Sequence, residues 1–143
     1  MAETYRVTSR VRWVNRMLGW LIRLGLAPKN NYLLTVRGRK TGRPYTTPVT
    51  LIEQDGRRWL VAPYGEVNWV RNARAAGRVE LSRKAQSETV SVHELSPAEG
   101  APVLKKYLEQ VPIVQPYFDA HPDSQLEIFE AEAPKHPVFQ IKT

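Results

Sequence analysis

The sequence contains no cysteine among its 143 residues. This absence excludes disulfide scaffolds, zinc sites with cysteine ligands, thiolate nucleophiles and iron–sulfur clusters. It also favours a reducing compartment, so we expect a cytoplasmic protein. Long apolar runs are missing too, because the stretch from Met17 to Leu26 is interrupted by Arg23, and a membrane span needs about 20 apolar residues. No small-residue cleavage site follows that stretch, so we expect neither a signal peptide nor a membrane span.

Acidic residues are scarce in the first part of the chain. Residues 1–84 hold 17 lysines and arginines against 5 acidic residues, whereas residues 85–143 hold 4 against 9. The net charge of +7 therefore comes from the first part. Such a surface suits nucleic acid, anionic lipid or a small phosphorylated molecule, although charge can also serve solubility alone. The length and the 42% hydrophobic share fit one domain over residues 1–143.

The first segment, residues 9–26, predicts an amphipathic helix that ends at Gly25 and Pro28. One face of this helix carries basic residues: Arg12, Arg16 and Arg23. Another face carries apolar residues: Trp13, Met17, Trp20, Leu21 and Leu24. Two interpretations are open. Either the helix packs on the core with a solvated basic face, or it lies on an anionic membrane surface with its tryptophans at the interface.

The rest of the chain is typical of an antiparallel barrel. Apolar patterning predicts six strands, over residues 32–36, 45–52, 59–62, 78–82, 88–95 and 138–141. Helices are predicted over residues 67–76, closed by Gly77, from the capping box that Ser96 opens to about Gln110, and around Tyr117. The Asp55-Gly56 pair predicts a tight hairpin. Because strands joined by tight turns are antiparallel, we expect a mainly β (α+β) fold, a small closed barrel with peripheral helices.

Familiar catalytic motifs are absent. No G-x-S-x-G, H-E-x-x-H, G-x-G-x-x-G or Walker sequence occurs. His93, His121 and His136 lack the spacing of metal ligands, so we expect no metal site. An enzyme without reactive groups of its own needs a cofactor, which the protein binds and orients.

A basic turn joins the first two predicted strands and spans residues 37–44, Arg-Gly-Arg-Lys-Thr-Gly-Arg-Pro. Arg39, Lys40 and Arg43 place three cations within five residues, beside Gly42, whose missing side chain lets backbone N–H groups approach an anion. A phosphate or several carboxylates would fit. A hairpin kept soluble by its charge is the alternative. The turn has neither interleaved aromatic residues nor a recognition helix, so we expect no nucleic-acid partner.

A resemblance rests on this turn. The run from Leu34 to Pro44, followed by Thr47-Pro48, Val61-Ala62, Asn68-Trp69-Val70-Arg71-Asn72 and residues 75–79, resembles the deazaflavin-dependent nitroreductase family of actinobacteria. The similarity covers about residues 30–95. It implies a split β-barrel like that of the related FMN-binding proteins, with coenzyme F420 as cofactor and FMN as the alternative. The implied activity is hydride transfer from F420H2 to enones, quinones or nitroaromatics.

The resemblance also implies the residues of the site. The basic turn and the strand after it would hold the cofactor: Arg39, Lys40, Thr41, Gly42, Arg43, Tyr45, Thr46, Thr47, Pro48, Val49 and Thr50. A second segment would line the deazaflavin ring: Ala62, Pro63, Tyr64 and Gly65. The start of the short helix would lie beside the phosphate: Asn68, Trp69, Val70, Arg71 and Asn72. On the substrate side we expect three tyrosines that can donate a proton or a hydrogen bond: Tyr45, Tyr64 and Tyr117.

The chain departs from the family pattern at two places. Tyr45 stands where the family commonly has arginine, and Tyr64-Gly65 stands where it commonly has a serine-lysine type pair. Arg43 and Arg71 are candidates to compensate. The leading hypothesis is an F420H2-dependent reductase of a hydrophobic acceptor. The alternatives are an FMN-dependent oxidoreductase, a non-catalytic binder of F420 or a flavin, and a protein that associates with membrane through its N-terminal helix.

Overall fold

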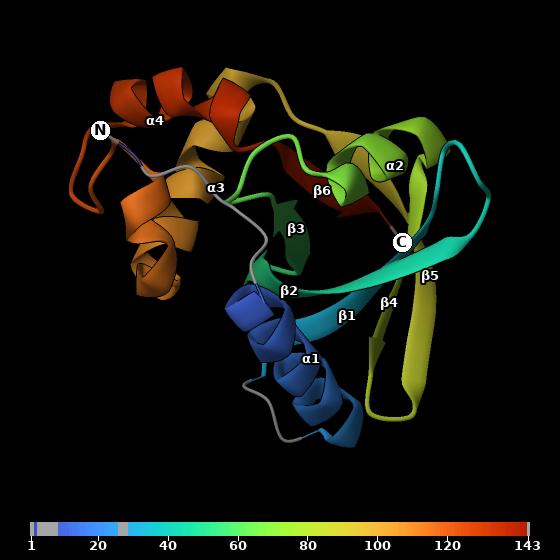
Figure 1. Cartoon of the computed structure of the whole chain (residues 1–143). Helices are drawn as coiled ribbons and strands as arrows, with labels where there is room; N and C mark the ends of the chain where they lie inside the picture. Colours follow the sequence, from blue (N-terminus) through green and yellow to red (C-terminus); the bar gives the residue numbers. More distant parts are fainter. Residues whose placement is uncertain (1, 3–8, 26–28, 143) are drawn as a thin grey trace.

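The computed structural model describes residues 2, 9–25 and 29–142, and its centre is a closed barrel (Figure 1). The strands are β1 (Asn31–Arg37), β2 (Pro44–Gln54), β3 (Arg57–Val61), β4 (Arg78–Arg83), β5 (Gln86–Glu94) and β6 (Val138–Lys142). Around the barrel their order is β1-β2-β3-β6-β5-β4, and every neighbouring pair is antiparallel. The predicted antiparallel barrel is confirmed.

Alternating side chains divide the strands between two cores. In β1 and β2, Leu34 and Leu51 point into the barrel, whereas their neighbours Leu33 and Ile52 are buried on the outside. This follows from the two-residue period of a strand. The outer face is buried because helices cover it. Strands β1, β2 and β3 therefore carry buried apolar residues at consecutive positions, whereas β4 and β5 alternate buried with exposed residues.

The turns follow their sequence signals. Asp55 and Gly56, between β2 and β3, have φ values of 54° and 76°, as the predicted hairpin requires. In the basic turn Gly42 has φ 74°, and its N–H donates to the carbonyl of Gly38 at 2.9 Å. Gly38 in turn donates to the carbonyl of Arg43 at 2.7 Å. The basic turn is thus a hydrogen-bonded loop of fixed shape.

Helix α2 (Asn68–Ala76) closes one end of the barrel. Its Val70 and Ala73 are fully buried against the barrel core. The helix ends where the sequence predicts, because Gly77 adopts φ 71° and donates to the carbonyl of Ala73 at 2.8 Å. Closure at this end places the start of α2 beside the basic turn.

Helices at the other side of the barrel form the second core. Helix α3 (Pro97–Gln110) begins at the predicted capping box, in which Glu99 and Ser96 exchange hydrogen bonds. The 3-10 helix η1 (Pro112–Tyr117) confirms the short helix expected near Tyr117. Helix α4 (Leu126–Glu132) and the 3-10 helix η2 (Ala133–Lys135), which the sequence analysis did not predict, follow. Together these elements pack on the outer faces of β2, β3 and β6 (Figure 1).

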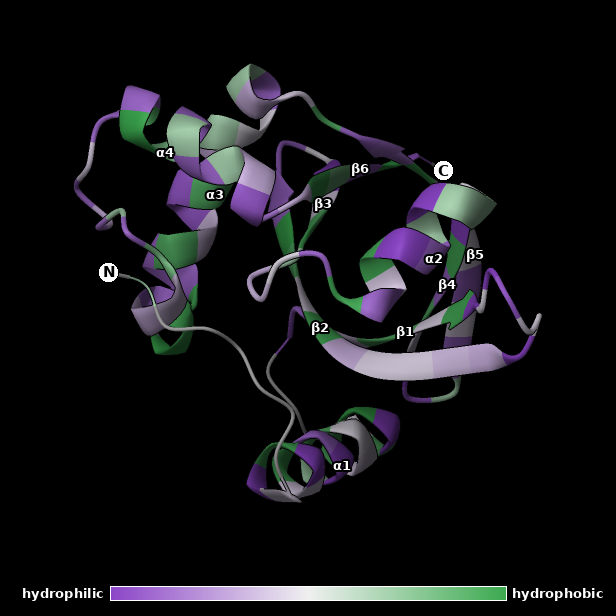
Figure 2. Cartoon of the chain, turned by 45° about the horizontal axis from the view of Figure 1, so that its top comes forward, coloured by the Kyte–Doolittle hydropathy of each residue, from purple (hydrophilic) through white to green (hydrophobic). Residues whose placement is uncertain are grey.

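Helix α1 (Ser9–Leu24) lies outside the barrel (Figure 2). It packs on β1 and β2 through an unexpected face. Ile22 is fully buried there against Leu33. Most of the apolar face that the sequence analysis identified is instead exposed: Trp13 by 61%, Met17 by 42%, Trp20 by 60% and Leu24 by 50%. Only Leu21 of that set packs on the sheet. Pro28, expected to help end the helix, lies outside the described residues.

None of the helices in the described part of the chain is long and apolar enough to cross a membrane.

Candidate functional site

A cavity of about 750 Å³ opens on the outer side of β2. Its walls are β2, the middle of α1, the loop that enters α2, and the junction of α3 with η1. Residues from these elements line it: Val14, Asn15, Leu18, Thr47, Pro48, Val49, Thr50, Val61, Pro63, Tyr64, Val67, Asn68, Trp69, Tyr107, Gln110, Val111, Ile113 and Val114, with Lys29, Asn30 and Asn31. A volume of this size suits a flat ring system and a second small molecule.

A smaller cavity of about 290 Å³ lies at the basic turn. Its walls come from the turn, from Tyr45 of β2 and from the start of α2. Asn72 of α2 fixes the turn, because its Oδ1 accepts from the backbone N–H of Arg39 at 3.0 Å and from the Arg39 guanidinium at 2.8 Å. Asn72 is buried, so this anchor is well defined.

The cations of the basic turn are not neutralised by any acidic residue that the structure describes. The partner of Arg39 is a neutral amide, so the positive charge of its guanidinium is uncompensated. Among the described residues no ion pair involves Arg39, Lys40, Arg43 or Arg71. By contrast, Arg74 pairs with Glu66 and Glu94 on the other side of α2, and these carboxylates raise its pKa. The basic turn is therefore electrostatically ready for an anion.

The two cavities adjoin at Asn68, whose side chain borders both. Asn68 is the first residue of α2, and no side chain caps this helix N-terminus. Free N–H groups and the positive end of the helix dipole at this position favour negative charge. A molecule with an anionic tail and a flat ring can therefore place its tail at the basic turn and its ring in the large cavity.

The structure distributes the predicted cofactor residues over both cavities. Those in the large cavity are Thr47, Pro48, Val49, Thr50, Pro63, Tyr64, Asn68 and Trp69. Those in the small cavity are Arg39, Lys40, Thr41, Tyr45, Asn68 and Asn72. The others border neither cavity: Gly42, Arg43, Thr46, Ala62, Gly65, Val70 and Arg71. Of these, Ala62 and Val70 are fully buried in the barrel core. Trp69 both lines the large cavity and packs on Phe139, with ring centroids 6.0 Å apart.

The three predicted tyrosines lie at different depths of the site. Tyr64 borders the large cavity, and its ring meets that of Tyr117 edge-on, with centroids 5.0 Å apart. Tyr117 lies behind Tyr64, packed against the second core, and does not border the cavity. Tyr45 belongs to the small cavity, where its hydroxyl lies 3.3 Å from that of Thr41. The structure thus brings Tyr64 and Tyr117 together and leaves Tyr45 with the basic turn.

Tyr107 also borders the large cavity, although the sequence analysis did not select it. It lies at the end of the apolar face of α3 and is 4% exposed. From the sequence alone it is a core residue, since Leu104 and Leu108 share its environment. Only the position of η1 shows that a cavity reaches it.

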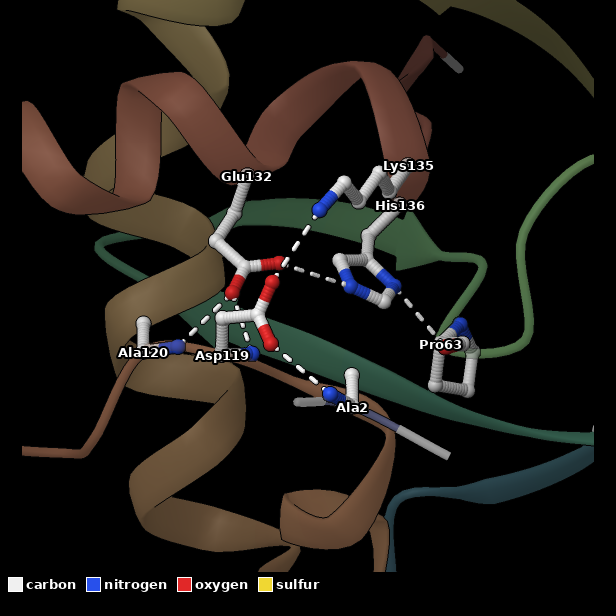
Figure 3. Close-up of polar contacts among 7 residues, drawn as sticks. All are labelled: Ala2, Pro63, Asp119, Ala120, Glu132, Lys135 and His136. Atoms are coloured by element: carbon white, nitrogen blue, oxygen red, sulfur yellow. Dashed lines mark hydrogen bonds and ion pairs between the residues drawn. The ribbon is translucent and has the colours of Figure 1, made fainter. Parts of the chain in front are cut away.

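A buried histidine supports the turn that lines the large cavity (Figure 3). Nδ1 of His136 lies 2.8 Å from the carbonyl oxygen of Pro63 and donates to it. Its ring stacks on Phe118, with centroids 3.8 Å apart. Burial lowers the pKa of His136, and the nearby Glu132 carboxylate opposes this shift. His136 therefore connects the C-terminal part of the chain to the Pro63 turn.

Glu132 completes this network. Its Oε1 accepts from the backbone N–H groups of Asp119 and Ala120, the latter at 2.7 Å. Asp119 in turn pairs with Lys135 at 3.1 Å and accepts from the backbone nitrogen of Ala2 at 2.8 Å (Figure 3). The lysine lowers the pKa of the Asp119 carboxyl. The network ties the loop after η1 to the end of α4.

Comparison with known proteins places the chain among redox proteins. The model of the F420H(2)-dependent quinone reductase family matches residues 7–132. Among solved structures, an F420-H2 dependent reductase aligns with a TM-score of 0.55 and 21% identity, over 80% of this chain and 95% of its own. A NimC/NimA family protein from Clostridium acetobutylicum aligns with a TM-score of 0.53 and 16% identity, over 88% and 79%.

A FAD-binding protein from Mesorhizobium loti aligns with a TM-score of 0.50 and 15% identity, over 87% and 86%. At these identities the solved structures show the fold alone. The search of curated proteins gave no match. The family match covers both cavities and the basic turn between β1 and β2.

Proposed function

Because the chain belongs to the F420H2-dependent quinone reductase family, we propose that it reduces quinones with F420H2 in the large cavity. Family membership makes it an oxidoreductase that depends on F420H2. The observation that supports this position of the cofactor is that both cavities border Asn68. There the basic turn, whose cations have no acidic partner among the described residues, meets a cavity large enough for a ring and an acceptor. Enones and nitroaromatics are further acceptors that we propose, since they too are electron-poor and small.

The residues present fit this cofactor. F420 carries a phosphate and a tail of glutamates, and the basic turn offers Arg39 and Lys40, which have no acidic partner within residues 9–25 and 29–142. Arg43 and Arg71 border neither cavity, but Arg43 belongs to the basic turn and Arg71 precedes Asn72, which holds that turn, so both would meet the outer charges of the tail. The deazaflavin ring would lie against Pro63, Tyr64 and Trp69. When bound, F420H2 supplies hydride from C5 of its ring.

The protein's own residues would then orient and shield the reactants. Tyr64 borders the cavity where the acceptor must meet the ring, and Tyr117 supports it from behind. Tyr45 lies with the basic turn, so we assign it a cofactor contact as well as the proton-donor role expected from the sequence. The proton that accompanies the hydride would come from a phenol or from water.

Parallel titration with F420 and FMN tests the proposal. Binding is followed by cofactor fluorescence, and turnover by the oxidation of F420H2 with a quinone, an enone and a nitroaromatic as acceptors. We expect preference for F420 and reduction of the quinone. Preference for FMN would support the alternative oxidoreductase, and F420 binding without oxidation by any acceptor would support a non-catalytic binder.

We further propose that α1 contacts the surface of an anionic membrane, on the cytoplasmic side that the lack of cysteine favours. At 100° per residue, Trp13, Met17, Trp20 and Leu24 lie opposite the buried Ile22, so one side of α1 packs on the barrel and the other is free. The helix carries four arginines and no acidic residue. Tryptophans with flanking cations are typical of helices in the interface plane of anionic bilayers.

The position of α1 relates this contact to the cavity. Val14, Asn15 and Leu18 of α1 line the cavity, and Ile113 of η1, 81% exposed, lies on another of its walls. A lipid-soluble acceptor would then have an apolar route from the bilayer to the site.

A further inference from the structure

The hydroxyl group of Tyr107 makes no hydrogen bond to any residue in the described part of the chain. Its ring is packed in the second core, between α3 and η1, and the residue is 4% exposed. A hydroxyl that the protein does not pair needs a hydrogen-bond partner from elsewhere, because sealing it from water without one would cost about 1–3 kcal/mol.

This hydroxyl faces the large cavity. Among the described residues, no side-chain oxygen or nitrogen that is sealed from solvent lacks a hydrogen-bond partner. The unpartnered Tyr107 oxygen is therefore reached by solvent, and the solvent that Tyr107 borders is the large cavity. The phenol is thus a hydrogen-bond donor whose partner must come from the cavity's contents.

The surroundings of Tyr107 suit an apolar molecule with a single polar atom. Val111 and Val114 line the same part of the cavity, and Gln110, one turn after Tyr107, is the polar residue that α3 contributes to the lining besides the Tyr107 hydroxyl. The basic turn adjoins the cavity elsewhere, at Asn68. The part between α3 and η1 is therefore free for the acceptor when the ring lies against the Pro63 turn and Trp69.

We propose that Tyr107 donates a hydrogen bond to a carbonyl oxygen of the acceptor and thereby fixes the acceptor in the part of the cavity between α3 and η1. The inference rests on the proposed function and names a residue that selects carbonyl compounds among the acceptors. A hydrogen bond to this oxygen strengthens as the oxygen gains negative charge during reduction.

The protonation state of Tyr107 agrees with this role. Burial raises the pKa of Tyr107, and the neighbouring Tyr64 adds to the rise. The phenol therefore stays protonated in neutral solution and donates a hydrogen bond while keeping its own proton. Reduction adds one hydride and one proton to a quinone, and in this role Tyr107 supplies neither, so that the proton comes from water or from another phenol.

The test compares Tyr107→Phe with wild type and with Tyr32→Phe, a matched loss of a hydroxyl outside both cavities. The first measurement is the affinity of a 1,4-naphthoquinone for protein loaded with oxidised F420, where no turnover occurs. We expect Tyr107→Phe to weaken this affinity roughly tenfold, the loss of one hydrogen bond. The affinity for F420 itself should change less than twofold, and Tyr32→Phe should match wild type in both.

The second measurement separates recognition from a general loss of structure. F420H2 oxidation is followed with the naphthoquinone and with a phenazinium dye, which has no carbonyl group. Tyr107→Phe should lower kcat/KM for the quinone roughly tenfold. For the dye, the fold-change in kcat/KM should be less than half of that for the quinone. Equal losses with both acceptors, or unchanged quinone affinity, would overturn the proposal. If wild type does not bind F420 at all, the proposed function fails first, and the inference falls with it.

Discussion

Nε2 of His136 lies 3.0 Å from Oε2 of Glu132, and both side chains are buried. Two lone pairs cannot face each other at this distance, so one proton is shared between the two groups. Through Nδ1 the same imidazole holds the carbonyl of Pro63. Glu132, at the C-terminal end of α4, thus acts through His136 on the position of the Pro63 turn, which lines the large cavity.

Substitution of His136 should destabilise the protein more than substitution of Glu132. His136→Phe keeps the stacking on Phe118 but leaves a buried carboxylate short of a donor, so we expect a loss of about 3 kcal/mol in the free energy of unfolding. Glu132→Gln keeps an acceptor for Ala120 and gains a donor for His136, so we expect about 1 kcal/mol. Urea unfolding measures both. Equal losses would show that the pair contributes only through packing.

Lys40 should contribute to cofactor binding and not to folding. It makes no ion pair among the described residues, so Lys40→Ala should change the unfolding free energy by less than about 0.5 kcal/mol. Loss of a charge-assisted contact should weaken F420 binding roughly tenfold. Lys106→Ala, which removes the same charge from α3, is the control and should bind F420 like wild type. Fluorescence titration decides between these outcomes.

Arg39 should behave differently from Lys40. Arg39→Ala removes both a cation and the bonds to the buried Asn72, so we expect weaker F420 binding together with a loss of about 1–2 kcal/mol in stability. The double loss of Arg39 and Lys40 should lower cofactor affinity by a larger factor than any single tyrosine substitution lowers the rate. Abolished turnover in Tyr64→Phe with intact F420 binding would contradict this ranking.

The exposed apolar face of α1, formed by Trp13, Met17, Trp20 and Leu24, should bind anionic vesicles. The double variant Trp13→Ala/Trp20→Ala should weaken sedimentation with phosphatidylglycerol vesicles roughly tenfold, because both indoles lose their place at the interface. Ile128→Ala, an exposed apolar residue on α4, is the matched control. Binding should fade with salt and be weak on neutral phosphatidylcholine. If gel filtration instead shows that wild type is a dimer and the double variant is a monomer, this face of α1 binds a second copy of the chain.

The capping box of α3 should make stability depend on acid pH. The backbone and hydroxyl of Ser96 lower the pKa of Glu99 from its usual value. The folded state therefore binds fewer protons than the unfolded state, so the stabilisation is complete above the unfolded pKa and is lost as the pH falls through the folded one. Unfolding free energies of wild type and Glu99→Gln should converge between roughly pH 5 and 3. Glu109→Gln, on the same helix, should follow wild type throughout.

The barrel was predictable because its signals are local. Strand alternation, the Asp55-Gly56 turn, Gly77 and the capping box at Ser96 each act within a few residues, and the structure has every one. Helix α4 was not predicted because it has only 7 residues and no side-chain cap, so its sequence carries no local helix signal. Its formation depends on Phe129, buried against α3.

The site was less accessible to prediction because its parts meet only in three dimensions. The basic turn was found from its charge density, but its anchor on Asn72 joins residues 33 positions apart. The cavity wall at Tyr107 exists because η1 folds back beside α3, and no periodicity encodes that. Spacing grouped the apolar residues of α1 on one face, but only Leu21 of them packs, because the face that packs is set by Leu33, on another element.

The two-sided burial of β1, β2 and β3 has a consequence for how this barrel can vary. A shift of one position along β2 would exchange Leu51 with Ile52 and so disturb the interior and the helical layer at once. Insertions and deletions are therefore tolerable only in the connections, such as Asp55-Gly56. Diversification of such proteins is thereby confined to loops, and the loop from residue 37 to residue 44 is where a change of ligand would be easiest to acquire.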